Sequence, residues 1–477
     1  MRRPHRLARA CIVATAAVFL LPFVFSAAGS AQSPQRHLYV SPGGSSASSC
    51  TRANPCRSLG RAFRLAAPGQ VVELLSGRYP GQTIGGAPKS SPTHVMFRPA
   101  RGASVSFGGR LTLDGSNHIT LSRLRLARAG ANDRSLFIDS CTTDVTFDHV
   151  SGETFFIMEG TRRITFRGGS WGGYKTPGEE DSAIGTSDAT GPGNRCGGKL
   201  ARPASGILFY RVTFHDVFWN VPSSRWGSSH PDCFEINGYV DGVTIRNSRF
   251  LRCASTFMQI NGDQGDMSNV TFEGNLYSQL GGDTWYGIMI TSEGKPGKCG
   301  NIVFRRNTYL PESPHASTWP NGPIRTDCEA VPGTSRVKVT GNLFARAPQG
   351  NECRRYLASP YVTSWTRNMF GSGSCGAASR HVPFGYALGS AGLRPSSSVQ
   401  AVRLVFALAA QGQRHAAIIR ELKRRQLAAP SAGWTRKTLD ALVSDSVYAG
   451  GAYGAPGSQP RLVSAKRWRA AQRLVKR

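Results

Sequence analysis

The strongest constraint on the fold of this chain is a recurring run of alternating apolar residues that ends in an aromatic ring. Such runs occupy residues 243–250, 270–277, 302–309 and 337–344. The position five before each aromatic, with its equivalents in earlier runs, falls at 121, 147, 166, 209, 245, 272, 304, 339 and 365. A single short strand cannot bury its apolar face, whereas stacked coils bury a continuous core. Period-2 alternation repeated every ~20–30 residues therefore predicts a β-solenoid.

Equivalent residues of successive coils should lie about 4.8 Å apart, which is the spacing between strands. The aromatics are then expected to form an internal stack: Phe214, Phe250, Tyr277, Tyr309, Phe344 and Phe370. Two positions earlier the chain holds Val212, Ser248, Asn275, Asn307, Asn342 and Asn368. This pattern predicts a ladder of amides at a bend, in which each buried amide bonds to the next. A two-sheet sandwich also has regularly spaced turns, but it does not demand the same residue type at one register.

Residues 37–375 resemble the right-handed parallel β-helix of the pectin-lyase-like superfamily. Their opening segment is similar to that of the family: a strand at 37–44, an amphipathic helix after Pro55 in which Leu59, Ala62, Phe63 and Leu65 recur at helical spacing, then Gly-Arg-Tyr-Pro at 77–80. The resemblance implies a mainly β fold with a solenoid core. It does not assign an activity, because one fold hosts many functions.

Residues 1–31 have the pattern of a signal peptide, with four arginines, an apolar stretch from 10 to 28 and small residues at 29–31. We therefore expect a secreted or cell-surface protein; a retained membrane anchor is the alternative. No later run approaches the ~20 apolar residues of a membrane helix, so no membrane span is expected in the mature chain. The sequence does not predict an oligomeric state.

The cysteines agree with export. Cys11 lies in the predicted signal peptide, and ten others remain, an even number that favours disulfides. Cys50 and Cys56 flank one loop and are the first predicted pair. Cys233 and Cys253 lie one coil apart and are close enough in sequence to pair. No Cys-x-x-Cys occurs, and no histidine has ligand spacing from a cysteine pair, so we expect no metal and no cofactor.

The formal net charge of +30 favours anionic partners. Residues 400–477 hold 15 Lys or Arg and 3 Asp or Glu, so +12 lies in this last part. Acidic polysaccharide, nucleic acid, teichoic acid and anionic lipid all remain open as partners. A GC-rich genome is a second explanation for the many arginines.

The apolar periodicity changes after residue 376. Residues 376–399 are rich in Gly, Ala, Ser and Pro and are predicted to be a linker. Apolar residues at helical spacing then predict three short helices, over 402–410, over 415–425 and from Thr435. Residues 400–477 are therefore expected to form a small all-α domain similar to a helix-turn-helix unit.

This C-terminal segment resembles the recombinase domain of large serine recombinases, with matches at 418–422, 434–439 and 446–450. The catalytic serine domain and the zinc ribbon of that family are absent from the sequence, so strand exchange is not expected. The resemblance implies DNA contact. Arg436 and Lys437 would enter a groove at the start of the third helix. Four residues of the preceding helix would hold phosphates: Arg420, Lys423, Arg424 and Arg425. A solvated basic module used for packing or adhesion is the alternative.

The longest spacings between coils mark insertions, and loops on a rigid scaffold are where sites usually lie. The most suggestive group is His230, Asp232 and Glu235, with Arg325 on a later coil. We expect Glu159 and Gln259 near the same column. Lys295 and Lys298 are further candidate cations.

A base and a cation would support β-elimination of a uronate, the chemistry of a polysaccharide lyase. Two carboxylates would instead support glycoside hydrolysis. The motifs of polygalacturonases and pectate lyases are absent from the sequence, and satisfied loop backbone is the simpler explanation of these side chains. The sequence thus predicts an exported β-helix that binds or cleaves an acidic polysaccharide. A non-catalytic surface-binding protein and a DNA-binding protein related to serine recombinases are the alternatives.

Overall fold

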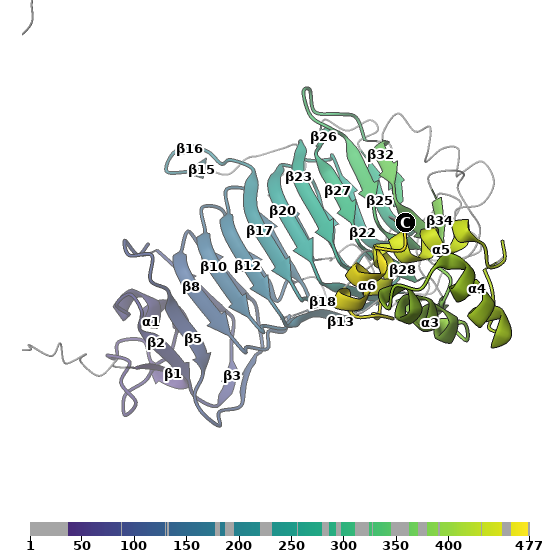
Figure 1. The fold of residues 1–477 in the computed structure, drawn as a ribbon. Coiled ribbons are helices and arrows are strands. Elements are labelled where there is room, and N and C mark those ends of the chain that lie inside the picture. The colour runs from purple at the N-terminus through teal and green to yellow at the C-terminus, as the bar shows by residue number, and fades with distance from the viewer. Residues whose placement is uncertain are drawn as a thin grey trace, which may run out of the picture. The chain divides into compact units, whose positions relative to one another are not determined.

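The computed structural model describes residues 37–86, 88–128, 130, 133–176, 182–186, 195–219, 231–254, 256–278, 286–291, 297–310, 324–326, 328–344, 362–370, 379–389, 392–430, 432–450 and 459–475. Residues 36–477 form one compact unit. Its main feature is a stack of parallel strands, in which neighbours within a sheet come from successive coils (Figure 1). The predicted signal peptide and Cys353 and Cys375 lie outside the described residues.

The largest sheet has 13 described strands. In spatial order they are β1 (Leu38–Ser45), β2 (Val71–Leu74), β5 (Val95–Pro99), β8 (Asn117–Ser122), β10 (Thr143–Asp148), β12 (Arg162–Arg167), β17 (Ala204–Tyr210), β20 (Val240–Arg246), β23 (Met267–Glu273), β27 (Ile302–Arg305), β30 (Val337–Thr340) and β32 (Val362–Thr366), with β26 (Cys299–Gly300) paired to β23.

Two further parallel sheets complete the coils. The 9-stranded sheet consists of β29 (Ile324–Thr326), β25 (Tyr286–Thr291), β22 (Thr256–Asn261), β19 (Glu235–Ile236), β14 (Ala183–Gly185), β11 (Phe155–Met158), β9 (Leu136–Ile138), β7 (Leu111–Asp114) and β4 (Gln82–Gly85). The 8-stranded sheet consists of β13 (Ser170–Thr176), β18 (Thr213–Trp219), β21 (Arg249–Cys253), β24 (Leu276–Ser278), β28 (Thr308–Leu310), β31 (Leu343–Phe344), β33 (Asn368–Phe370) and β34 (Ser379–His381). Three parallel sheets built coil by coil define a parallel β-helix, as predicted.

Two short strand pairs and one helix complete the β-helix region. β3 (Gly77–Tyr79) pairs with β6 (Val105–Phe107), and β15 (Arg195–Cys196) pairs with β16 (Lys199–Leu200). The predicted amphipathic helix is α1 (Leu59–Leu65), which begins where the Ser58 side chain accepts a hydrogen bond from the Arg61 N–H. Leu59 and Phe63 are buried in the core, but Leu65 is 41% exposed. The prediction for Leu65 was wrong, because the helix ends at this residue and the chain turns away.

The strand register confirms the repeat. All nine anchor positions lie in one column of the 13-stranded sheet, running Leu121, Phe147, Phe166, Phe209, Ile245, Phe272, Phe304, Val339 and Trp365. The aromatic positions likewise lie in one column of the 8-stranded sheet, which runs from Trp171 to Phe370. One register over so many coils follows from the period-2 geometry, because a shift by one residue would turn every apolar side chain outward.

The aromatic stack forms inside the solenoid as expected. The rings of Phe250, Tyr277, Tyr309 and Phe344 are 0–1% exposed, and successive centroids lie 4.7–4.9 Å apart. Beside the stack, the predicted amide ladder is also confirmed. The Asn307 Oδ1 accepts from the Asn275 N–H at 2.9 Å, and the Asn307 Nδ2 donates to the Phe272 carbonyl at 3.0 Å. At the bend, backbone N–H and carbonyl groups are buried, and these bonds give them hydrogen-bond partners that they would otherwise lack.

Four disulfides link the described cysteines: Cys50–Cys56, Cys141–Cys196, Cys233–Cys253 and Cys299–Cys328. The first and third are the pairs that the sequence indicated. The second closes the longest loop of the four, because its cysteines are 55 positions apart in the sequence. A bridge over a longer loop restricts the unfolded chain more strongly in the chain-entropy description.

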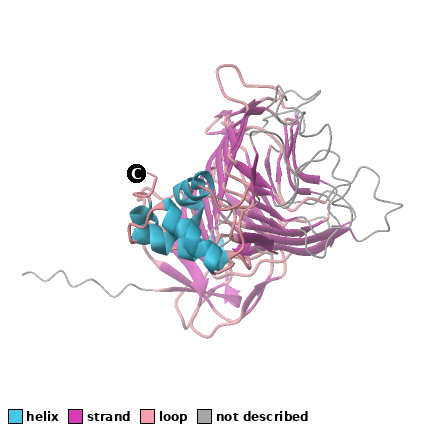
Figure 2. Cartoon of the chain, turned by 45° about the vertical axis from the view of Figure 1, so that its right-hand side comes forward, coloured by secondary structure: helices cyan, strands magenta, loops and turns pink. Residues whose placement is uncertain are grey.

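The C-terminal segment is helical, as predicted, and its helices gather in one group (Figure 2). They are α3 (Val399–Ala410), α4 (His415–Arg424), α5 (Arg436–Ser444), the 3-10 helix η4 (Ser446–Ala449) and α6 (Ala465–Ala471). Trp434 and Tyr448 are 8% and 3% exposed and belong to the apolar cluster of this group. Among the described residues, no helix is long and apolar enough to cross a membrane.

The segment predicted as a linker, 376–399, instead contributes to this helical group. It holds the hairpin of β35 (Tyr386–Gly389) and β36 (Gly392–Pro395). Tyr386 is 6% exposed, and its hydroxyl donates to the carbonyls of Val447 and Pro460. The composition is typical of a linker, but an aromatic residue and Leu393 suffice to anchor the hairpin on the helices.

The ladder and the stack predict opposite effects of two neighbouring substitutions. Asn307→Ala removes bonds to buried backbone groups and should lower the free energy of unfolding by about 1–3 kcal/mol for each group left unpaired. The Tyr309 hydroxyl has no hydrogen-bond partner among the described residues, so Tyr309→Phe should be neutral or stabilising. Urea unfolding of both variants measures this. A loss of stability in Tyr309→Phe equal to that in Asn307→Ala would contradict this account of the stack.

Candidate functional site

The predicted polysaccharide site centres on one outward-facing column of the 9-stranded sheet. Glu235 pairs with Gln259, which pairs with Met289, which pairs with Arg325. The predicted alignment of Gln259 and Arg325 with Glu235 is therefore present in the backbone. Glu159 is not in this column, because the equivalent position of β11 is Phe156, three residues earlier. The error arose because the turn after β11 could not be located from the sequence.

The Glu235 carboxylate is held by two amide side chains. Its Oε1 accepts from the Asn261 Nδ2 at 3.0 Å, and its Oε2 accepts from the Asn237 Nδ2 at 3.2 Å. The Asn261 Nδ2 also donates to the Asn237 Oδ1 at 2.9 Å. Glu235 is 9% exposed although alternation turns it away from the core, where the next residue, Ile236, is buried. The network orients a carboxylate on the outer face of the sheet.

Asp232 has a different environment from Glu235. It is fully buried, and its Oδ1 accepts from the backbone N–H of Thr256 at 2.9 Å. The next residue, Cys233, forms the disulfide with Cys253 and donates its N–H to the Thr256 carbonyl. Asp232 therefore ties one coil to the next. This contact fits the alternative interpretation of Asp232, in which its carboxylate serves as a hydrogen-bond acceptor for the backbone.

The remaining predicted site residues are less fully described. His230 and Lys295 lie outside the described residues, and for Arg325 the structure gives the strand position. Lys298 is described: its Nζ lies 3.7 Å from Glu329, and its N–H donates to Asp266 at 2.9 Å. Lys298 therefore belongs to a turn beside the 13-stranded sheet and not to the Glu235 column.

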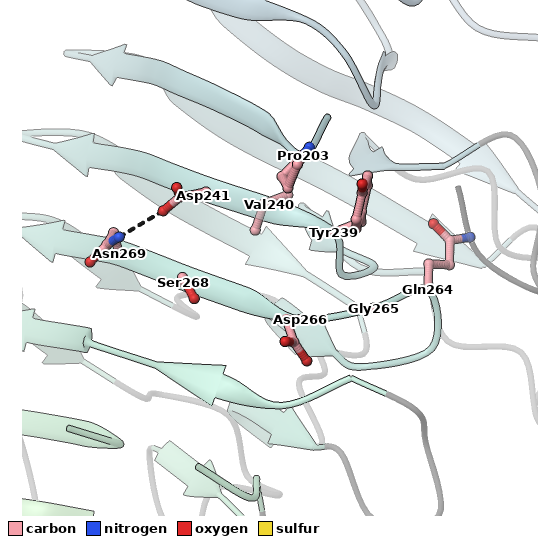
Figure 3. A pocket seen from close by; sticks show the side chains of 9 residues that line it. All are labelled: Pro203, Tyr239, Val240, Asp241, Gln264, Gly265, Asp266, Ser268 and Asn269. Carbon is pink, nitrogen blue, oxygen red and sulfur yellow. Dashed lines mark hydrogen bonds between the residues drawn. The ribbon is translucent and has the colours of Figure 1, made fainter. Parts of the chain in front are cut away.

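A pocket of about 530 Å³ lies next to the Glu235 network, at the turns that lead into β20 and β23 (Figure 3). Its lining consists of Pro203, Tyr239, Val240, Asp241, Gln264, Gly265, Asp266, Ser268 and Asn269. Gln264 belongs to both features, because its N–H donates to the Asn237 carbonyl and its Oε1 accepts from the Thr186 N–H.

The pocket presents two carboxylates beside an aromatic ring. The Asp241 Oδ1 accepts from the Asn269 Nδ2 at 2.6 Å (Figure 3), and the Tyr239 hydroxyl donates to the Ala201 carbonyl. Such a lining suits a ligand with hydroxyl groups, or a cation, better than a ligand that carries a carboxylate. The sequence did not predict this pocket, because its residues come from separate turns and from the starts of β20 and β23, which have no common motif.

In the C-terminal module, α4 carries the four residues predicted to hold phosphates. Glu421 pairs with two of them: the Arg424 side chain donates to its two oxygens at 2.7 and 2.8 Å, and the Arg425 Nε donates at 2.6 Å. Hydrogen bonds from Arg424 and then Arg425 lower the pKa of Glu421 to about 2. Arg420 and Lys423 are exposed on the same helix. The four cations are therefore not equivalent.

The predicted groove-reading residues lie at the start of α5 and are exposed. Thr435 caps the start of the helix, and its side chain accepts from the Thr438 N–H in a capping box. Leu439, Leu442 and Val443 are buried. The opposite side borders a hollow of about 550 Å³ lined by Arg436, Lys437, Asp440, Ala441 and Ser444. Asp440 is held by His415 of α4, with 2.7 Å between the His415 Nε2 and the Asp440 Oδ1.

These features define a parallel β-helix joined to a basic helical module. Residues 396–477 match the model of the Recombinase family, which confirms the second resemblance. Among solved structures, the chain is similar to a rhamnogalacturonan lyase at 13% identity, over 66% of this chain and 84% of that one, with a TM-score of 0.42. It is also similar to pectate lyase Pel9A at 14% identity, over 65% and 76%, with a TM-score of 0.35. No curated protein matches the chain.

The environments of the two carboxylates predict different effects on stability. Asp232→Ala leaves a buried N–H of Thr256 without its acceptor, so the free energy of unfolding should fall by about 1–3 kcal/mol. Glu235→Gln keeps the size of the side chain at the sheet surface and should change stability far less. Thermal unfolding of both variants tests this. A larger loss in Glu235→Gln would mean that the Glu235 network is mainly structural.

Proposed function

We propose that the C-terminal module binds duplex DNA through the exposed side of α5. The observation that carries this proposal is the position of Arg436 and Lys437, exposed at the start of a capped helix whose other side is buried. A recognition helix contacts base edges with residues near its N-terminus. Ala441 and Ser444, one and two turns further along, are small enough to allow close approach to a groove. The match to the Recombinase family supports the same assignment.

Phosphate contacts would come from α4. Arg420 and Lys423 are the better candidates, because Glu421 already pairs with Arg424 and Arg425. An exported chain would meet extracellular DNA or another polyanion. Recognition of DNA then requires more than charge, since any anionic polymer attracts a basic surface.

Removing two charges from α5 should weaken DNA binding more than removing two charges from α4. Arg436→Ala with Lys437→Ala is compared with Arg424→Ala with Arg425→Ala, which changes the net charge equally. The full chain is titrated with duplex DNA at several salt concentrations. Loss of two phosphate contacts would flatten the dependence of log K on log salt by up to about 2. We expect the α5 variant to lose about tenfold or more in affinity, or 1.4 kcal/mol.

Equal losses in the two variants would mean that charge alone governs binding, and would remove α5 as the specific surface. Heparin and a uronate polymer serve as comparison ligands in the same titration. DNA should bind more tightly than either at matched salt if the α5 surface reads a groove.

We further propose that the β-helix binds an acidic polysaccharide along the Glu235 column and cleaves it by β-elimination. The Glu235 carboxylate is oriented by Asn237 and Asn261, and Arg325 lies three strands further along the same column. Three strand spacings amount to roughly 14 Å. Arg325 would therefore hold a uronate further along the polymer than the one beside Glu235. A column that places Glu235, Gln259 and Arg325 at multiples of the strand spacing suits a linear ligand.

Elimination fits the described residues better than two-carboxylate hydrolysis. Hydrolysis needs two carboxyl groups that flank the scissile bond, ~5–10 Å apart. Asp232, the sequence candidate for the second group, is fully buried and bonded to the Thr256 backbone. In elimination, Glu235 would take the C5 proton next to the uronate carboxyl group, and the C4–O glycosidic bond would break to leave a C4=C5 double bond. The departing oxygen would take a proton from water, and a cation would stabilise the negative charge that develops on the uronate.

Glu235→Gln should abolish cleavage while leaving the polymer bound. The full chain is incubated with a panel of uronate polysaccharides, and the absorbance of unsaturated uronates is recorded. Glu329→Gln is the matched control, since Glu329 is 68% exposed in a different turn. Loss of a general base costs about 10²–10⁴-fold in rate. Full activity in Glu235→Gln would exclude this residue as the base. Binding without any product would reduce the proposal to a non-catalytic surface-binding protein.

A further inference from the structure

Two imidazoles and one carboxylate converge on the 13-stranded sheet, where β5, β8 and β10 lie side by side (Figure 1). They belong to His94, His118 and Asp144, whose side chains are 24%, 13% and 28% exposed. Each residue comes from a different coil, directly before a buried core residue: Val95, Ile119 and Val145. The cluster lies far in sequence from the Glu235 column and from the C-terminal module.

The register brings the three residues into one column. Val95 pairs with Ile119, and Ile119 pairs with Val145, so the residues before them are neighbours too. His118 and Asp144 have left-handed backbone, with φ of 52° and 57°. Later coils fill the same column with Asn269 and Asn301, at φ of 57° and 55°. Asparagine adopts this conformation more readily than most residues. The backbone therefore does not require histidine or aspartate here.

The donor atoms point toward one another. The His94 Nε2 lies 3.3 Å from the Asp144 Oδ2, and the His118 Nδ1 lies 2.5 Å from the same oxygen. The ligand atoms of all three residues lie within 4.8 Å of one another. The other nitrogen of His94, Nδ1, lies 2.9 Å from the Thr120 Oγ1. That contact orients the His94 ring so that its Nε2 faces the cluster.

Other aspartates of this chain that pair with a histidine also pair with an arginine. Asp148 pairs with His149 and Arg167, and Asp216 pairs with His215 and Arg252. In each case one imidazole and one guanidinium share the carboxylate. Asp144 instead faces two imidazoles and forms no ion pair with an arginine or lysine of the described residues. Two neutral imidazoles and one carboxylate are typical ligands of a divalent transition metal.

We propose that His94, His118 and Asp144 bind a zinc ion. Zinc accepts histidine nitrogen and aspartate oxygen at ~2.0–2.2 Å, and sites with three protein ligands keep a fourth position for water. Ligand atoms around a tetrahedral ion at these bond lengths lie about 3.3–3.5 Å apart. The His94–Asp144 separation already has this value. The His118–Asp144 contact has to open by about 1 Å, which a partly exposed carboxylate can do by rotation.

Thr120 would then orient a ligand. Metal-bound histidines donate their second ring N–H to an oxygen, and removal of that partner typically costs 10–100-fold in metal affinity. The ion would also cross-link three successive coils near the N-terminal end of the solenoid. Zinc bound to the folded chain alone would raise its stability by mass action. Sequence spacing did not reveal the site, because its ligands are 24 and 26 residues apart instead of three or four.

The test uses the full chain after treatment with a chelator. We expect calorimetric titration with Zn²⁺ to give one ion per chain and thermal unfolding to show a higher Tm with zinc. His118→Asn and Asp144→Asn retain a residue type that this column accommodates elsewhere. Each should fold without zinc, lose about tenfold or more in zinc affinity and lose the zinc-dependent rise in Tm. Thr120→Val should lose affinity by roughly 10–100-fold.

His149→Asn is the matched control. His149 also has left-handed backbone, with φ of 55°, and it is 64% exposed beside a single carboxylate. This variant should bind zinc as the parent chain does. The absence of zinc binding in the parent chain would overturn the proposal and leave the cluster as a hydrogen-bonded group. Unchanged zinc affinity in both His118→Asn and Asp144→Asn would overturn it too, because zinc would then be bound elsewhere.

Discussion

Hydrogen bonds between asparagines at one bend of the solenoid hold its later coils in register. Asn275, Asn307, Asn342 and Asn368 are fully buried, and each accepts a backbone N–H from the preceding coil. An unpaired N–H in that position would cost about 1–3 kcal/mol, so the bend is tolerated only when every amide finds its partner. The ladder thereby holds successive coils at one register. The aromatic stack beside it follows the same register.

Outward columns give this fold its capacity for binding. On the outer faces, as in the core, a residue type can recur or change from coil to coil at a constant spacing. The Glu235 column combines a carboxylate oriented by two amides with a later arginine position, in a line suited to a polymer. The His94 column gathers three ligands within 4.8 Å. Both arise from the same geometry, and their chemistry differs because few positions on the outer face are needed for folding.

The C-terminal module has a structural role besides any role in binding. Its apolar cluster includes Leu343 and Met369 of the last described coils, together with Tyr386 and Leu393 of the hairpin. A solenoid needs its terminal repeat covered, since an open end would expose core residues and strand edges. The helices meet this need with one side and present Arg436 and Lys437 on another. Packing and polyanion binding, which appear as alternatives in the sequence, are therefore compatible in the structure.

The solenoid, its register, two disulfides and the three main C-terminal helices could be predicted from the sequence, because each depends on local period or on one residue type repeated at fixed spacing. The aromatic column from Phe214 to Phe344 and the asparagine ladder were predictable for this reason. The folded structure was needed to show that Asp232 is buried and links two coils, that Glu159 lies outside the Glu235 column, and that residues 386–395 form a hairpin on the helices. It also brought His94, His118 and Asp144 together. These features depend on where each turn ends and which coil lies beside it, and contacts between distant residues leave no pattern in the sequence unless one residue type repeats from coil to coil.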